Sequence, residues 1–139
     1  MTGADKQGRA VLGVDPGTRK VGWALAGDAQ SAAIALGIEP IESLMERLNP
    51  LLGSHPIRAV ALGAGTNAEA LANLLESLRV PVHFIDERDT TYRARELYFA
   101  DNPPRGWRKW VPLSLQMPPR PIDDYAALLI ARRHIALGG

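Results

Sequence analysis

The chain has 139 residues, of which 46% are apolar, so it is long enough to bury the core of one domain. It contains no cysteine, which excludes disulfides and thiolate-bound metals. The net charge is only +1, but residues 1–87 carry 7 Lys or Arg and 10 Asp or Glu, whereas residues 88–139 carry 9 and 5. This shift from −3 to +4 is typical of a protein with a polyanionic partner, although ordinary surface variation explains it equally well.

The hydropathy of the chain bears on its location. The first ten residues are polar, and the sequence holds neither a signal-peptide core nor an apolar run long enough to cross a membrane. We therefore expect a soluble, cytoplasmic protein without a membrane partner. We also expect residues 1–139 to form a single domain.

The predicted elements begin with strands and then alternate. Apolar runs that end in turn residues predict strands over 9–14, 20–26, 32–38, 57–62 and 80–85. Apolar residues at helical spacing predict helices that begin at Pro40, at a cap on Thr66 or Asn67, at a cap on Thr90 or Thr91, and at Ile122. The third helix is expected to end at about Phe99.

This element order predicts an α/β fold. The first two strands are close enough to pair as an antiparallel hairpin, and the later strands alternate with helices, so we expect a central five-stranded mixed sheet flanked by helices. Residues 101–121 are rich in Pro and Gly and break every periodicity. We expect this segment to be a flexible loop.

Three carboxylates lie where they could meet at one end of the sheet. Asp15 ends the first strand, Glu87 follows the fifth strand in FIDERDTT, and Asp123 begins the last helix. Carboxylate oxygens suit Mg²⁺ or Mn²⁺, and two such ions together can hydrolyse a phosphodiester. Each acid alone could also be a turn, salt-bridge or helix-start residue, but their joint occurrence in this order favours a metal site.

Three motifs in sequence order, VLGVDPGTRKVGWALAGD, VHFIDERDTT and PIDDYAALLIA, resemble those of the YqgF family. These are Holliday-junction-resolvase-like proteins of the RNase H-like superfamily, and the resemblance covers nearly the whole chain. It implies an RNase H-like fold and a nuclease that uses two ions of Mg²⁺ or Mn²⁺ in maturation of precursor ribosomal RNA. Carried over to this chain, it implies that Asp15, Glu87 and Asp123 are catalytic and bind metal, with Asp124 as a supplementary ligand.

The chain departs from the family pattern in two places near the acids. The segment ALGAGTNAEA lacks the proline that the family carries after its fourth strand, and Asp89 adds negative charge beside Glu87. Both changes keep the three acids. They leave open which substrate the protein prefers.

Two segments could contact nucleic acid. The turn after Asp15 combines a glycine with cations, which suits a phosphate, and the segment NPPRGWRKWVPLSLQMPPRP interleaves tryptophans, which stack on unpaired bases, with cations. These tryptophans could instead pack on the core or on a partner chain, whereas Trp23, inside a strand, is assigned to the core. The residues that we expect to contact nucleic acid are Thr18, Arg19, Lys20, Arg105, Trp107, Arg108, Lys109 and Trp110.

Other functions compete with that of a ribosomal RNA nuclease. A catalytically silent nucleic-acid-binding module would have no need of the retained acids. A kinase with a DPGT phosphate loop needs two such domains, for which 139 residues leave no room. A resolvase acting on four-way DNA junctions would require a homodimer to cut two strands symmetrically. The sequence does not decide between RNA and branched DNA.

Overall fold

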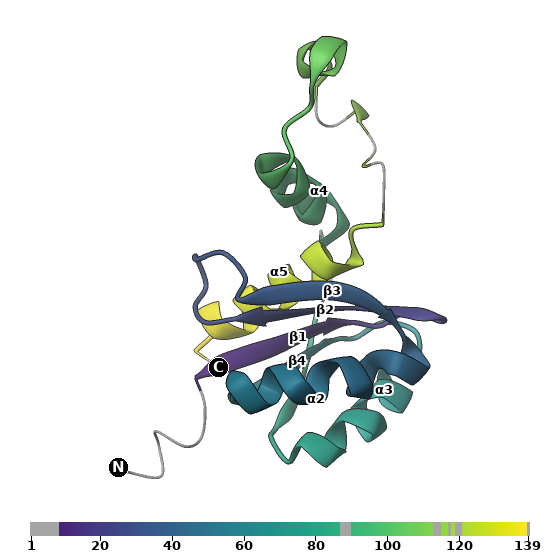
Figure 1. Ribbon diagram of the computed structural model, residues 1–139, viewed down its shortest axis with the longest axis vertical. Helices are drawn as coiled ribbons and strands as arrows, with labels where there is room; N and C mark the ends of the chain where they lie inside the picture. Colours follow the sequence, from purple (N-terminus) through teal and green to yellow (C-terminus); the bar gives the residue numbers. More distant parts are fainter. Residues whose placement is uncertain (1–8, 87–89, 113–114, 117, 119–120, 139) are drawn as a thin grey trace.

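The computed structural model of this protein describes residues 9–86, 90–112, 115–116, 118 and 121–138. Its centre is a five-stranded mixed sheet with the order β3-β2-β1-β4-β5 (Figure 1). β1 pairs antiparallel with β2 and parallel with β4, and β5 lies parallel to β4. The predicted sheet is therefore confirmed. Its strands are β1 (Ala10–Asp15), β2 (Lys20–Ala26), β3 (Ala35–Pro40), β4 (Ile57–Gly63) and β5 (Val82–Ile85).

Helices cover both faces of the sheet. α2 and α3 pack on one face with the largest buried cluster, α5 packs on the other face, and α4 packs on the outer side of α5. Within the described ranges, no helix has the length and apolar character needed to cross a membrane. The helices are η1 (Ile41–Ser43), α2 (Leu44–Ser54), α3 (Ala68–Leu75), η2 (Glu76–Leu78), α4 (Thr90–Asp101), η3 (Gly106–Trp110) and α5 (Asp123–Ala136), where η marks a 3-10 helix.

The alternation of side chains along β1 divides the core into two layers. Leu12 and Val14 belong to the cluster beneath α2 and α3, whereas Val11 belongs to the cluster beneath α5. Because successive residues of a strand point to opposite faces, Gly13 and Asp15 share the α5 face with Val11. Asp15 therefore ends its strand on the side of the sheet that α5 covers.

α5 crosses the sheet from β2 to β5. A Cβ added at Gly13 would lie 2.8 Å from the Cβ of Ala131 and closer still to the carbonyl oxygen of Ala127, so the helix backbone rests directly on β1. In its last turn, the ring of His134 stacks on that of His83 in β5, with 4.7 Å between centroids. This course places the first residue of α5 at β1 and β2.

Two helix starts differ from those predicted. Pro40 is both the last residue of β3 and the N-cap of η1, so the helix begins one residue later than predicted and becomes α-helical only at Leu44; the ψ of 146° at Pro40 is extended and continues the pairing of β3 with β2. Asn67 does precede α3, but its φ is 72° and its side chain makes no cap hydrogen bond. The Asn67 amide instead donates to the carbonyl oxygen of Gly17, 3.2 Å away, which ties the start of α3 to the turn after β1.

The segment predicted as a loop over 101–121 contains regular structure. α4 continues to Asp101, and η3 forms at the far end of an arm that projects away from the sheet (Figure 1). The side chain of Gln116 holds this end together, because its Nε2 donates to the carbonyl oxygens of Arg108 and Val111 at 2.7 and 2.8 Å. The flexibility of the segment stays a prediction.

Candidate functional site

Asp15 and Asp123 lie beside each other at the end of β1. Asp15 pairs with Gly22 across the β1–β2 ladder, so the two residues face the same side of the sheet. A Cβ added at Gly22 would lie 2.8 Å from the Cβ of Asp123 and closer still to its carbonyl group. The start of α5 thus sits on the bare backbone of Gly22, next to the Asp15 side chain.

Gly22 is the feature of this arrangement that sequence analysis missed. A glycine inside a strand signals a close approach of other backbone, and KVGWALA carries one at its third position. Gly13 makes the same kind of contact further along α5. The two glycines bring the helix close enough for acids 108 positions apart in sequence to become neighbours.

The environment of Asp123 disfavours its negative charge. Burial raises the pKa of the half-buried Asp123 carboxyl, and the charge of Asp124 raises it further, whereas Lys20 acts in the opposite direction. Lys20 shares a face of β2 with Gly22, which explains its influence. A cation bound at Asp123 would favour the charged form of its carboxyl, so this acid fits a metal ion.

Asp124 is almost completely buried, with 3% of its surface exposed. Its Oδ1 accepts a hydrogen bond of 3.0 Å from the backbone N–H of Tyr125. The hydroxyl of Tyr125 donates in turn to Oδ2 of Asp101 at 2.9 Å, which ties the start of α5 to the end of α4. This geometry leaves the supplementary metal-binding role of Asp124 a prediction.

The third predicted acid, Glu87, lies outside the described residues. β5 ends at Ile85, and the next residue, Asp86, is exposed. Because β1, β4 and β5 run parallel, their carboxyl ends share one edge of the sheet. Within the described part of the chain, no group of three His, Asp or Glu side chains could hold a metal. A three-carboxylate site therefore depends on Glu87.

Hydrogen bonds from Asn67 and from Ile41 fix the turn after Asp15, and its polar residues are exposed. A Cβ at Gly17 would collide with the carbonyl oxygen of Lys20, so the turn needs a glycine there. The carbonyl oxygen of Arg19 accepts a 3.1 Å hydrogen bond from the N–H of Ile41. The turn exposes all three predicted phosphate contacts, Thr18, Arg19 and Lys20. Of these, only Lys20 is among the groups that shift the pKa of Asp123, which its charge lowers.

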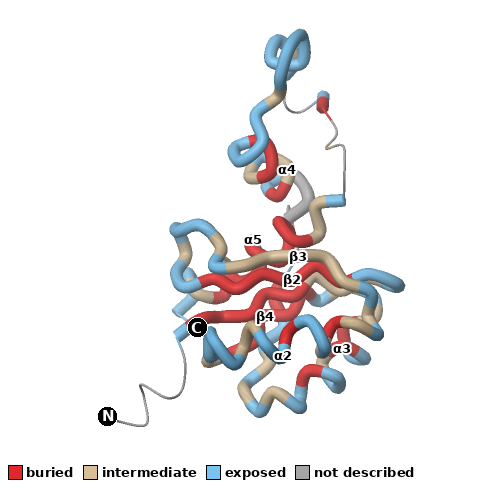
Figure 2. Tube along the Cα trace, viewed as in Figure 1, coloured by how far each residue is buried: buried red, intermediate tan, exposed pale blue. Residues whose placement is uncertain are grey.

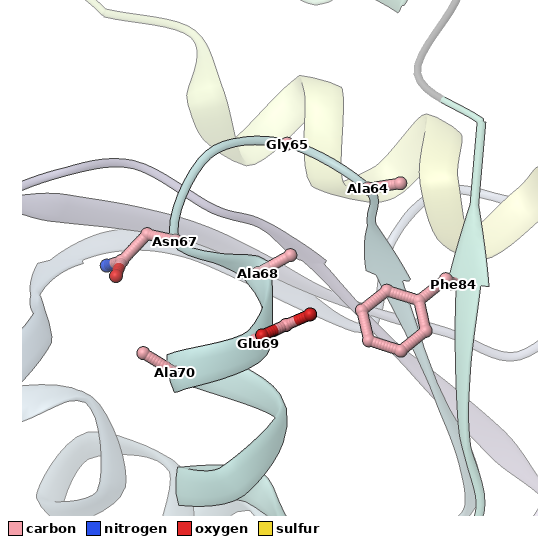
Figure 3. Close-up of a pocket in the computed structure, with 7 residues that line it drawn as sticks. All are labelled: Ala64, Gly65, Asn67, Ala68, Glu69, Ala70 and Phe84. Carbon is pink, nitrogen blue, oxygen red and sulfur yellow. The ribbon is translucent and has the colours of Figure 1, made fainter.

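A pocket of about 630 Å³ lies beyond the end of β4, on the side of the sheet that α3 covers. Figure 3 shows Ala64, Gly65, Asn67 and Ala68 framing it, with Glu69 and the ring of Phe84 facing each other across it. Asn67 links this pocket to the turn after Asp15. Among the described residues, none of the predicted acids or cations lines it.

The arm carries the other predicted nucleic-acid contacts far from the acids. Figure 2 shows its end as exposed, and Trp107 and Trp110 are 73% and 80% exposed. The tryptophans therefore do not pack on the core, whereas Trp23 is fully buried there, as predicted. The guanidinium of Arg108 lies 5.9 Å from the Trp107 ring, and the Lys109 Nζ lies 5.5 Å from the Trp110 ring. Arg105 is exposed at the base of η3.

Comparison with solved structures identifies the fold. RuvC from Thermus thermophilus aligns over 90% of this chain and 92% of its own, with a TM-score of 0.59 and 15% sequence identity. The chain has an RNase H-like fold. A second structure, T. thermophilus RuvC in complex with a Holliday junction substrate, aligns over 90% and 91%, with a TM-score of 0.58 and 18% identity. No protein-family model and no curated protein sequence matches the chain.

Proposed function

We propose that this protein is a metal-dependent nuclease that hydrolyses phosphodiester bonds in branched DNA. One observation carries the proposal: the backbone of Asp123 sits on Gly22, directly across the ladder from Asp15. Burial and the charge of Asp124 make ionisation of Asp123 costly for stability unless its charge serves a cation, and Asp15 lies beside it at the carboxyl end of the central strand. The RNase H-like fold offers a scaffold for such chemistry.

Asp15, Asp123 and Glu87 would hold Mg²⁺ or Mn²⁺, with Asp124 as a supplementary ligand. Bound ions of this kind lower the pKa of a water and stabilise the leaving oxygen of a phosphodiester. The protein's own contribution is positioning. Gly22 fixes the start of α5, and Lys20 places a positive charge beside Asp123, where it can orient a phosphate group.

The arm supplies the reason to favour substrates with unpaired bases. Each exposed indole has a cation over one face, which leaves the other face able to stack on a base. A four-way junction offers unpaired or unstacked bases at its centre, and duplex DNA does not. Thr18 and Arg19 would add phosphate contacts on the body of the protein, and Arg105 would add one on the arm, at the start of η3.

The choice of branched DNA differs from the RNA substrate that the YqgF resemblance implies. The solved RuvC complex contains a Holliday junction, and that likeness supports a junction as the substrate here. Symmetric cutting of a junction would need two copies of this chain. Processing of precursor ribosomal RNA remains the principal competing function.

The test is cleavage of three labelled substrates, a four-way DNA junction, single-stranded DNA and single-stranded RNA, each with Mg²⁺, Mn²⁺ or EDTA. We expect metal-dependent cutting of the junction, lost in Asp15→Asn and Asp123→Asn and kept in Glu76→Gln, which neutralises a remote exposed acid. Preferential cutting of RNA would favour the ribosomal function. Binding without cutting of any substrate would favour a silent module.

A further inference from the structure

Two of the three histidines of the chain meet between α5 and β5. The ring of His134, in the last turn of α5, stacks on that of His83 with 4.7 Å between the ring centroids and 25° between the ring planes. His83 is exposed, whereas only 6% of the surface of His134 is exposed. The contact therefore joins a buried imidazole to one that solvent reaches.

The buried imidazole is poorly suited to carry a proton on both ring nitrogens. Nε2 of His134 is buried and has no hydrogen-bond partner in the part of the chain that the structure describes. A neutral imidazole has an N–H on one nitrogen, whereas an imidazolium has one on each. Protonation would therefore leave a buried N–H at Nε2 without an acceptor, and burying such a donor on a charged group is costly.

The groups around His134 also oppose its protonation. Burial lowers the pKa of His134, and the neighbouring His83 and Arg58, in that order, lower it further. Arg58 belongs to β4 and His83 to β5, and Arg133 precedes His134 on its own helix. Among the described residues of β1, β2, β3 and α4, none is among the groups that shift this pKa. The first acid after β5 is Asp86, three residues and about 10 Å beyond His83 in the strand direction.

β5 is the element that can yield most easily. It has four residues, lies at the edge of the sheet and pairs with β4 alone. Val60 and Ala64 donate backbone hydrogen bonds to the carbonyl oxygens of Pro81 and Ile85, at 2.8 and 3.1 Å, at the two ends of β5. A short edge strand with few partners opens locally at a lower cost than the central strands do.

We propose that the stacked histidine pair is an acid-sensitive latch that holds β5 against α5. While His134 is neutral, the two rings stay stacked. When His134 takes up a proton, the exposed His83 ring turns aside and β5 loosens, so that water reaches Nε2 and accepts its hydrogen bond. Like charges at this separation repel, so the stacked arrangement also excludes protonation of both rings together.

The sign of the pH dependence follows from the direction of the shift. The ordinary pKa of histidine is 6.5, and the pKa of His134 in the folded protein is lower. The latch therefore contributes its full stability above pH 6.5 and loses it as the pH falls from 6.5 through the folded-state pKa.

The first measurement is an NMR titration of the histidine ring protons in the metal-free protein. The three histidine signals are assigned by their loss in His55→Gln, His83→Gln and His134→Gln. We expect His134 to titrate at a lower pH than His55, which is exposed at the end of α2. His83→Gln should bring the titration of His134 closer to that of His55, because water then reaches the buried ring more easily.

The second measurement is hydrogen exchange of the Val60 and Ala64 amides, which report whether β5 is in place. We expect their protection factors to fall about threefold to tenfold between pH 7.5 and 5.5 in the wild type. The Ile34 amide, which donates to Leu25 far from the latch, should keep its protection. His134→Gln should abolish the pH dependence, whereas the matched control His55→Gln should behave as the wild type does.

Three outcomes would overturn the proposal. They are titration of His134 together with His55, unchanged protection of Val60 and Ala64 at the two pH values, and a pH dependence that persists in His134→Gln. If His134→Gln does not fold, the titration and the exchange of the wild type decide the matter. Neither measurement uses metal or nucleic acid, so its result is independent of the proposed function.

Discussion

The contact between Gly22 and Asp123 makes Gly22→Ala the sharpest perturbation of the candidate site. The added methyl group would lie 2.8 Å from the Cβ of Asp123, whereas ordinary contacts begin at 3.4 Å. The start of α5 must therefore retreat by at least about 0.6 Å, and by roughly 1 Å at the carbonyl group, which is closer. No neighbouring flexible side chain can absorb this shift, because the colliding atoms belong to the helix backbone.

Two measurements follow from that displacement. Overpacking of this kind costs about 1–3 kcal/mol in the free energy of unfolding, which corresponds to a fall of about 4–12 °C in melting temperature. Because Asp123 would move relative to Asp15, we also expect metal-dependent cleavage to fall about 100-fold at a temperature where the variant is folded. Urea unfolding and single-turnover cleavage measure the two effects separately.

Gly27→Ala is the matched control. A Cβ there would meet only the Cδ1 of Ile34, at 3.8 Å, so stability should stay within about 0.5 kcal/mol of the wild type or rise. The reasoning is refuted if Gly22→Ala unfolds at the same urea concentration as Gly27→Ala and cleaves as fast. That result would mean that α5 does not rest on β2 as described.

Three further predictions concern the acids and the arm. Because the pKa of Asp123 is raised in the folded state, ionisation of this carboxyl lowers stability as pH rises through that pKa. Asp123→Asn should therefore raise the melting temperature of the metal-free protein at pH 7, and this gain should vanish below about pH 3.8. Melting curves recorded across this pH range test both expectations. Gln116→Ala removes two hydrogen bonds worth about 1 kcal/mol each, so limited proteolysis should cut near η3 faster while the melting temperature hardly changes. Trp110→Ala should leave stability within about 0.5 kcal/mol but weaken junction binding by about 1–3 kcal/mol, and unchanged anisotropy titrations would contradict base stacking.

The sequence by itself determined the sheet and most element bounds. β2 matches its predicted range, and the other strands differ by a few residues, because alternating or continuous apolar runs ended by Pro and Gly are local signals. The helix predicted to start at Pro40 begins at Ile41 as η1 and becomes α-helical only at Leu44, for a non-local reason. Pairing of β3 with β2 extends the strand through Pro40 and delays the helix.

The sequence also predicted the residues of the candidate site, because motifs and element ends single out Asp15 and Asp123. It did not predict that these two residues lie next to each other. Their proximity depends on α5 crossing two bare glycine backbones, Gly13 and Gly22, and a glycine in a strand does not reveal which helix will lie on it.

Tertiary structure alone decided where the cations lie. The basic half of the chain divides between an exposed arm, which carries Trp107 and Trp110, and a pocket that Arg93 shares with the last helix. Net charge along a sequence records how many cations a segment has, but not where each of them lies in the fold. Their positions depend on packing between α4 and α5, which contacts such as that of Tyr125 with Asp101, 24 residues apart, hold in place.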